Sequence, residues 1–426
     1  MFFKILHAVT GGRRRAWRWA LLAPVSLAAQ SPRGTLTFGD LLGRLDRASP
    51  MIAAARASAD AATARIGPAT ALPDPRAEFA VMNRMLPSLS TMSPLAMDQL
   101  TVTQMLPLAT RRAATHAATQ RAAAAARRID VQRAIARRDA ALMLADWWQA
   151  DTARAVMDET RTLLREGAAA AEAMYRAGQG RQTDVLTMQA ELTRMTAEQV
   201  AMDGMRRSAA ASLGAMLDAV LDPDSLRVAL PVLATAHPSD ATAAEVSAAA
   251  QRVEASRAEE RVARQERWPE LEVGVQLGQR PNTSERMVGV MVGASLPIFA
   301  ASRQQKMAEE AVAMRRMAEA DARSAAAVAR AGAAEATAAV ERARALQRLY
   351  DGTLLPQLRA AFESANSAYR AANGNAESVL NALMAMNTAK LARLAAQADE
   401  TRALARLEYF TGQAWLAVPM HTEPTR

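Results

Sequence analysis

The feature that most constrains this chain is a run without proline between residues 109 and 177. Alanine, arginine, glutamate, glutamine, methionine and leucine predominate in it, and most of these are strong helix formers. At about 1.5 Å per residue the run predicts a helix about 100 Å long, which no ordinary globular domain holds. We therefore expect an extended rod, and an aromatic content of only 4% agrees with the lack of a compact aromatic core.

The plan of the chain is repeated, which is the central result from the sequence. The segment Leu106-Pro107-Leu108 corresponds to Leu296-Pro297-Ile298, and Tyr175-Arg176-Ala177 corresponds to Tyr369-Arg370-Ala371. The domains that we predict are a first repeat (29–221), an equatorial linker (222–237), a second repeat (238–418) and a C-terminal tail (419–426).

Each repeat is expected to contain the same five elements in the same order. The first has a helix at 38–66, ended by Gly67-Pro68, then a β-hairpin at 74–106, the long helix at 109–177, a tip turn at 178–180 and a return helix at 182–217. The second has a helix at 238–267, a β-hairpin at 270–298, a long helix at 300–371, a tip turn at 372–375 and a return helix at 377–411.

The return helices are about half as long as the outgoing helices, so another helix must complete each return. We expect 182–217 to stack end to end with 238–267, and 377–411 with 38–66. Both hairpins then lie at one end of the rod and both glycine turns at the other.

The N-terminal segment 1–28 is predicted to be a signal peptide. A basic stretch is followed by an apolar run and by small residues at Ser26-Leu27-Ala28. The net charge of +9 falls to about +4 when Lys4 and the arginines at 13, 14, 15 and 18 are set aside. Export from the cytoplasm follows, and the basic character does not indicate a nucleic-acid partner.

The second hairpin alternates apolar with polar or small residues. Its apolar positions, which we interpret as facing lipid, are Leu271, Val273, Val275, Leu277, Val288, Val290 and Val292. Strands of about ten residues with this pattern are typical of outer-membrane barrels, although a soluble hairpin packed on helices has the same alternation. Four strands cannot close a barrel, and an open edge is unstable in hydrocarbon. Association is therefore required, as two copies with eight strands or three with twelve.

No pattern for catalysis or for a cofactor is found. There is no cysteine, the four histidines are scattered, and no phosphate-binding loop or metalloprotease motif occurs, so we expect neither an enzyme nor a metal site. Met188, Met195 and Met202 recur every seven residues. Thioether ligands for copper are one interpretation, but a seam of packed helices is the favoured one.

In order and spacing, the chain resembles the TolC family of outer-membrane efflux channels. The resemblance lies in the Leu36-Thr37 opening, the Leu72-Pro73-Asp74 and Trp268-Pro269-Glu270 strand entries, the Leu-Pro-Leu/Ile strand exits and the two tip segments. It implies a mainly α fold with a β-barrel portion: a trimer with one twelve-stranded barrel in the outer membrane, continued by a periplasmic α-helical barrel. The implied partners are a periplasmic adaptor protein and an inner-membrane pump.

The Leu355-Pro356-Gln357 and Leu72-Pro73-Asp74-Pro75 segments are more similar to the branch that serves pumps of the resistance-nodulation-division (RND) type, especially heavy-metal cation exporters. Two other functions are considered. One is a soluble or surface-attached coiled-coil scaffold, and the other is an exit channel for type I secretion or for drug efflux.

The resemblance also implies a site at the helical tips, where members of the family dock the adaptor and narrow the pore. The corresponding positions are Tyr175, Gly178, Gly180, Thr183, Asp184, Tyr369 and Gly374. Asp184 and Tyr369 are expected to form a hydrogen bond between the repeats; alternatively, Thr183-Asp184 caps the return helix. Ser378 and Asn381 replace a carboxylate ring, and Gly374 replaces a bridging arginine, so a tight cation gate is not expected.

Overall fold

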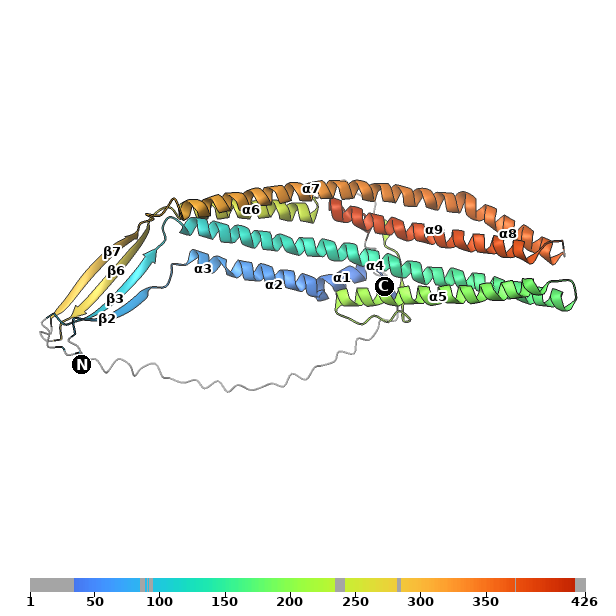
Figure 1. The fold of residues 1–426 in the computed structure, drawn as a ribbon, viewed down its shortest axis with the longest axis horizontal. Helices are drawn as coiled ribbons and strands as arrows, with labels where there is room; N and C mark the ends of the chain where they lie inside the picture. The colour runs from blue at the N-terminus through green and yellow to red at the C-terminus, as the bar shows by residue number, and fades with distance from the viewer. Residues whose placement is uncertain are drawn as a thin grey trace, which may run out of the picture.

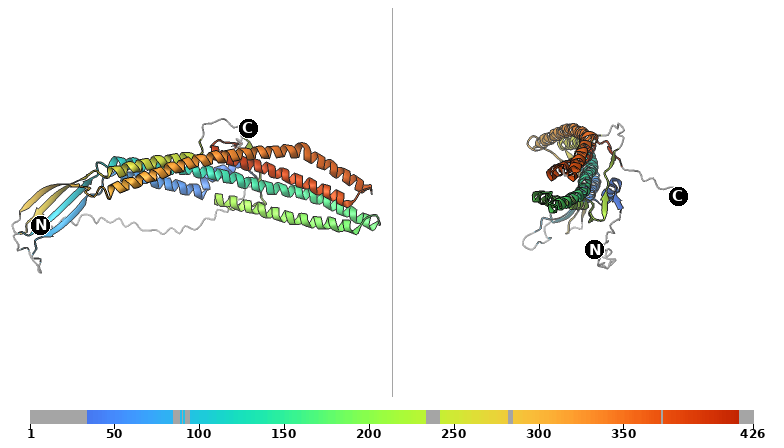
Figure 2. Two further views of the ribbon diagram at one scale, coloured as in Figure 1. Left: turned by 45° about the horizontal axis from the view of Figure 1, so that its top comes forward. Right: turned by 90° about the vertical axis from the view of Figure 1, so that its right-hand side faces the viewer.

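The computed structural model describes residues 34–84, 89, 91, 95–233, 242–281, 285–371 and 373–417. The predicted signal peptide (1–28) and C-terminal tail (419–426) lie outside the described residues. The molecule is elongated, with a β-sheet at one end, two helical hairpins at the other and a layer of long helices between them (Figure 1). Seen along the long axis, the helices form a curved row rather than a closed bundle (Figure 2).

The N-terminal stretch forms three helices rather than the single predicted one, after a short strand β1 (Gly34–Leu36). They are α1 (Phe38–Ala48), α2 (Pro50–Ala64) and α3 (Ile66–Thr70). Thr37 caps α1, because its side chain accepts a hydrogen bond from the Asp40 amide. Gly67-Pro68 lies inside α3 instead of ending the helix, since a proline in a first turn removes an amide that has no helical acceptor.

Helix α4 (Arg111–Arg176) is continuous over 66 residues and is followed by α5 (Gln182–Leu217). The second repeat has α6 (Ala244–Gln265) and α9 (Ala376–Thr411), but its long helix is interrupted. Helix α7 (Gln304–Leu349), the π-helix η1 (Tyr350–Leu354) and α8 (Leu355–Arg370) have 46, 5 and 16 residues, one more in total than α4. A π-turn accommodates one extra residue, and Pro356 is the second residue of the helix that follows it.

The stacking of the short helices differs from the prediction. Helix α6 is in line with α9, and both lie between α4 and α7; α5 is in line with α2 on the other flank of α4 (Figure 1). The prediction paired α5 with α6 because they are consecutive in the sequence. Helices α5 and α6 instead lie on opposite flanks of α4, so one flank is covered by α2 and α5 of the first repeat and the other by α6 and α9 of the second.

The sheet is antiparallel, in the order β2 (Arg76–Met82), β3 (Met97–Leu106), β6 (Glu270–Gln279) and β7 (Arg286–Ser295). The hairpins of the two repeats join through β3 and β6, where Val102 lies opposite Val275. Val275 in turn lies opposite Val290, so the apolar positions continue across the sheet on one face. In the described part of the chain, β2 and β7 each have a single neighbouring strand.

The linker, predicted to be irregular, contains two short strands. Strand β4 (Leu226–Val228) pairs with β1 in parallel, and β5 (Val232–Leu233) pairs antiparallel with β8 (Leu416–Ala417). Arg206, only 5% exposed, holds the start of the linker through Asp224 at 2.5 Å and the carbonyl of Pro223 at 3.2 Å. The largest buried side chains, including Trp147 and Phe38, form the main core at this level of the rod.

None of the helices in the described ranges combines the length and the apolar character needed to cross a membrane.

Candidate functional site at the helical tips

The far end of the rod is held by a second apolar core between the α4–α5 hairpin and the α8–α9 hairpin. Its members come from all four helices and include Leu164, Met188, Met195, Tyr369 and Leu380. Met188 and Met195 are almost fully buried there, and Met202 packs at the edge of the cluster. The interpretation of the methionine heptad as helix packing is therefore confirmed.

Both hairpins turn through a glycine that the backbone geometry requires. A Cβ atom added to Gly180 would lie 3.0 Å from the Tyr175 amide nitrogen, and one added to Gly374 would lie 3.0 Å from the Tyr369 amide nitrogen. These contacts are closer than almost any real Cβ makes, so a side chain at either position would force the turn open. The two repeats thus use the same turn at the same place, with Gly178 adding a left-handed residue (φ +72°) in the first.

The helices that leave the two turns begin differently. Asn375 caps α9, because its Oδ1 accepts a hydrogen bond of 2.8 Å from the Ser378 amide. The N-cap of α5 is Arg181, which makes no such bond, and Thr183 and Asp184 lie inside the first turn. The capping role considered for Thr183-Asp184 is therefore wrong. Asp184 still has a favourable place, since the N-terminal end of a helix attracts negative charge.

The tip tyrosines occupy equivalent places but different surroundings. Tyr369 is 6% exposed within the tip core, whereas Tyr175 is 46% exposed on the outside of the first hairpin. Burial raises the pKa of the Tyr369 hydroxyl, and the nearby negative charge of Asp184 raises it further. Asp184 therefore acts on Tyr369 from the other repeat, while the hydrogen bond expected between them stays a prediction.

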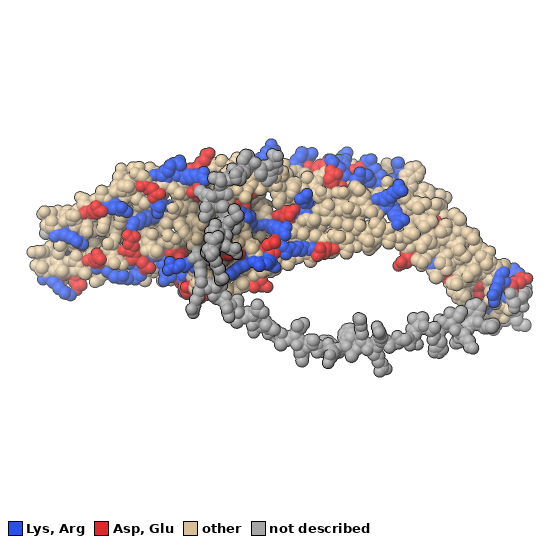
Figure 3. Space-filling model, turned by 180° about the vertical axis from the view of Figure 1, so that it is seen from behind, with Lys and Arg blue, Asp and Glu red and all other residues tan. Residues whose placement is uncertain are grey.

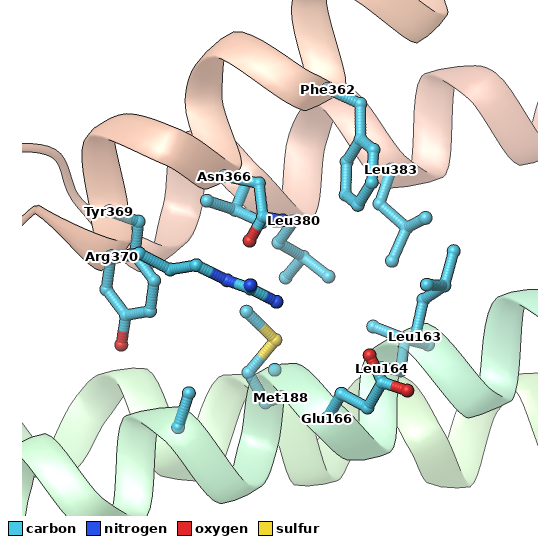
Figure 4. Close-up of a pocket in the computed structure, with 13 residues that line it drawn as sticks. Leu163, Leu164, Glu166, Met188, Phe362, Asn366, Tyr369, Arg370, Leu380 and Leu383 are labelled. Atoms are coloured by element: carbon cyan, nitrogen blue, oxygen red, sulfur yellow. The ribbon is translucent and has the colours of Figure 1, made fainter.

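A small pocket of about 50 Å³ opens between the two hairpins (Figure 4). Its floor is apolar, with Met188, Leu164 and Leu383, while Glu166 on α4 and Arg370 on α8 reach it from opposite sides. Arg370 corresponds to Arg176, which pairs with Glu172 one turn earlier; Asn366 stands in place of that glutamate in the second repeat.

Three residues of the tips were not predicted as site residues from the sequence: Glu166, Arg370 and the cap Asn375. The signal for Arg370 is that Asn366 stands where the first repeat has Glu172, so Arg370 lacks the carboxylate that pairs with Arg176. Asn375, which directly follows the turn glycine, is the usual residue type for a helix cap.

At the opposite end, the apolar positions predicted for the second hairpin are all exposed on one face of the sheet. Val288, Val290 and Val292 on the edge strand are the most exposed, at 73%, 78% and 74%. The face continues onto the first hairpin through Phe79, Leu100 and Val102. No helix of the described chain covers it, which removes the alternative of a hairpin packed on its own helices.

Charged side chains are spread over the helical part of the molecule and are sparse on the sheet (Figure 3). At the end of the sheet remote from the helices, Arg84 pairs with Asp98 and Arg280 with Glu285. At the end next to the helices, the strands carry Arg76, Glu78, Glu270 and Glu272, so charges limit the apolar band at both ends.

Comparisons with known proteins agree with this architecture. Residues 239–413 match the family model described as outer membrane efflux protein. No curated protein matches the sequence significantly.

Among solved structures, the chain is similar to the outer membrane protein VceC of Vibrio cholerae, with 17% identity, a TM-score of 0.76, and 88% of this chain and 95% of that chain covered. It is also similar to the CmeC outer membrane channel of Campylobacter jejuni, with 12% identity, a TM-score of 0.74 and coverage of 88% and 85%. The open state of the MtrE outer membrane channel of Neisseria gonorrhoeae gives 17% identity, a TM-score of 0.70 and coverage of 88% and 88%.

These matches agree with the resemblance drawn from the sequence: residues 239–413 match the outer membrane efflux protein family, and the chain has the fold of these outer-membrane channels.

Proposed function

We propose that this protein is an outer-membrane efflux duct that carries substrates from a periplasmic adaptor and an inner-membrane pump to the exterior. The observation that carries the proposal is the four-stranded sheet with one largely apolar face, which no described helix covers, and two edge strands. Unpaired backbone groups at such edges are costly in hydrocarbon, so neighbouring copies must supply the missing strands. Three copies would give a barrel of twelve strands, continued by a tube of helices in the periplasm.

The dimensions support this arrangement. Strands β6 and β7 have ten residues each, which is the length that a tilted strand needs to cross a bilayer. The curved row of helices presents lateral edges that further copies would extend into a tube. The residues at the helical tips would contact the adaptor and set the width of the pore at that end of the duct. They are Tyr175, Gly178, Gly180, Thr183, Asp184, Tyr369 and Gly374.

The pump that we propose is of the RND type, with heavy-metal cations as one substrate class. The support is the Leu355-Pro356-Gln357 segment, which directly follows the π-helix. Type I secretion and drug efflux are the other substrate routes to be compared. Deleting the gene and measuring resistance to copper, silver, zinc and a panel of drugs distinguishes these routes.

The duct itself is tested by two substitutions at neighbouring positions of β7. Val290 lies on the apolar face and Met291 on the other face of the same strand. Val290→Arg should cost about 2–4 kcal/mol in the bilayer and abolish assembly into heat-modifiable oligomers. Met291→Arg should assemble normally and shift the conductance in planar bilayers toward anions.

Equal behaviour of the two variants, or a wild-type chain that stays in the soluble fraction and forms no conducting oligomer, would refute the duct. The second outcome would favour the coiled-coil scaffold.

A further inference from the structure

The junction between sheet and helices contains a groove that the proposed duct does not require. It lies in the second repeat, where α6 enters β6 and β7 leaves toward α7, and it has a volume of about 490 Å³. Its lining combines exposed apolar side chains, among them Ile298 and Phe299, with the charged groups of Glu266, Glu270 and Arg303. An open groove of this mixed character is suited to an amphipathic ligand.

The apolar part of the groove is unusually exposed. Ile298 is 78%, Phe299 70% and Trp268 56% exposed, and the guanidinium of Arg267 lies 5.6 Å from the centre of the Trp268 ring. At the corresponding places the first repeat has Leu108, Ala109 and Leu72, without an aromatic ring. The second repeat has therefore acquired a tryptophan and a phenylalanine at the level where the sheet begins. Aromatic residues of this kind concentrate at membrane–water interfaces.

The charged part of the groove has unused binding capacity. Within the described residues, Arg303 and Glu266 form no ion pair, although both line the groove. Glu270 accepts a hydrogen bond of 3.0 Å from Thr110 Oγ1 and lies on the face of β6 opposite to that of Leu271, so it is not counted among the ligand-binding groups. One guanidinium and one carboxylate match a ligand with one phosphate and one amine, because each charge of the ligand then meets its opposite.

We propose that this groove binds an aminophospholipid with a zwitterionic headgroup, with its phosphate on Arg303, its ammonium on Glu266, and its acyl chains along Ile298 and Phe299. The inference rests on the proposed function, because it requires the sheet to lie in a bilayer. The apolar face starts at Leu271 and Ala294, the first pair inside the junction, so the groove falls at the depth of the headgroups on the helical side. Each protomer would carry one lipid, which fixes how deeply the barrel sits.

The depth is tested by tryptophan fluorescence in proteoliposomes made with phospholipids brominated near the headgroup. Among the other tryptophans of the described residues, Trp147 and Trp415 belong to the main core at mid-rod and Trp148 is the next residue of α4, far from any bilayer around the sheet, so the quenched signal should come from Trp268. Wild-type protein should lose fluorescence, and Trp268→Phe should show no quenching. Conducting wild-type oligomers whose fluorescence is not quenched would overturn the inference and leave the duct intact.

The headgroup is tested by native mass spectrometry of oligomers released from mixed phosphatidylethanolamine, phosphatidylcholine and phosphatidylglycerol. The wild type should retain phosphatidylethanolamine preferentially, and Arg303→Gln and Glu266→Gln should each reduce its retention about tenfold, the effect of losing one charge-assisted contact of about 1.4 kcal/mol. Arg316→Gln, an exposed arginine on the same helix α7, should retain it fully.

Equal retention of the three lipids, or unchanged retention in both groove variants, would refute the site. Conductance of the variants, measured in parallel, reports on the duct alone. A chain that neither inserts nor conducts contradicts the proposed function itself.

Discussion

The two tip hairpins have the same turn but different degrees of burial. Gly180 and Gly374 approach the backbone of Tyr175 and Tyr369 in the same way, yet only Tyr369 enters the core between the hairpins. Tyr175, in the same position of the first repeat, points away from that core. Tyr369 in the second repeat therefore packs within its own chain, whereas Tyr175 in the first repeat is exposed and can contact a neighbouring molecule.

The long helices differ in a way that explains this asymmetry. Helix α4 continues unbroken to its tip, whereas η1 separates α7 from α8, and α8 descends toward the first hairpin (Figure 1). A proline clashes with the carbonyl four residues before it in a regular helix, and a π-turn relieves that clash. The offset between matched residues rises from 190 at Leu106 and Leu296 to 194 at Tyr175 and Tyr369, so the second repeat has four added residues in this stretch, and the π-turn accommodates one of them where the helix bends.

The largest difference between the repeats should appear when each tyrosine is truncated. Tyr369→Ala removes a ring buried in the tip core and should lower the free energy of unfolding by about 3 kcal/mol. Tyr175→Ala, the matched control, should change it by less than about 0.5 kcal/mol in the isolated protomer. Urea unfolding followed by circular dichroism measures both. Similar losses in the two variants would show that the repeats are not asymmetric.

The bend is tested by making the second long helix equal in length to α4. Deleting Gly352, which no neighbouring atom approaches, removes the extra residue of η1. Pro356 then lies within a regular helix, and the deletion should cost about 3 kcal/mol.

Combining the deletion with Pro356→Ala should restore stability and straighten the helix, with increased conductance as the readout. A deletion that is neutral while Pro356 is present would contradict the role of the π-turn.

A smaller effect is expected from the buried polar contact between the repeats. Thr160 Oγ1 on α4 lies 2.9 Å from Asn387 Oδ1 on α9, and both residues are buried. Thr160→Val leaves the amide oxygen without this donor and should cost about 2 kcal/mol.

Thr193 on α5 occupies the place of Asn387 in the first repeat and is exposed, so Thr193→Val should be almost neutral. Thermal unfolding of the two valine variants makes the comparison, and equal shifts would argue against an energetic role for the contact.

The smallest expected effect concerns pH. Because burial and Asp184 raise the pKa of Tyr369, folding favours the neutral phenol. This contribution is fully present below the ordinary pKa of about 10 and is lost as the pH rises from there through the raised value. The wild type should therefore lose stability between about pH 10 and 11 relative to Tyr369→Phe.

Asp184→Asn should reduce this loss, by less than about 1 kcal/mol. Unfolding free energies at pH 9 and 11 provide the measurement, and an identical pH dependence in the wild type and Tyr369→Phe would exclude the linkage.

Much of the fold follows from patterns that repeat along the chain. The absence of proline from 109 to 177 predicts a helix, and the alternation of apolar residues in 270–279 predicts a strand. Both predictions rest on local conformational preferences, and the structure has α4 and β6 there. The resemblance also named Asp184 and Tyr369, which interact across the repeats.

The remaining features depend on tertiary context. Nothing local distinguishes a proline after a π-turn, as at Pro356, from one that ends a helix, or reveals that the linker crosses α4. The pocket between Glu166 and Arg370 exists only because α8 bends, so neither residue stood out in the sequence.

The crossing of the linker over α4 has a consequence for biogenesis. Helix α4 is made early, but the helices on one of its sides, α6 and α9, are synthesised only after the linker, and α9 follows the whole second hairpin. Half of the chain alone would leave alanine and leucine surfaces of α4 open to solvent. The full set of contacts on α4 can therefore form only after nearly the entire polypeptide has been synthesised.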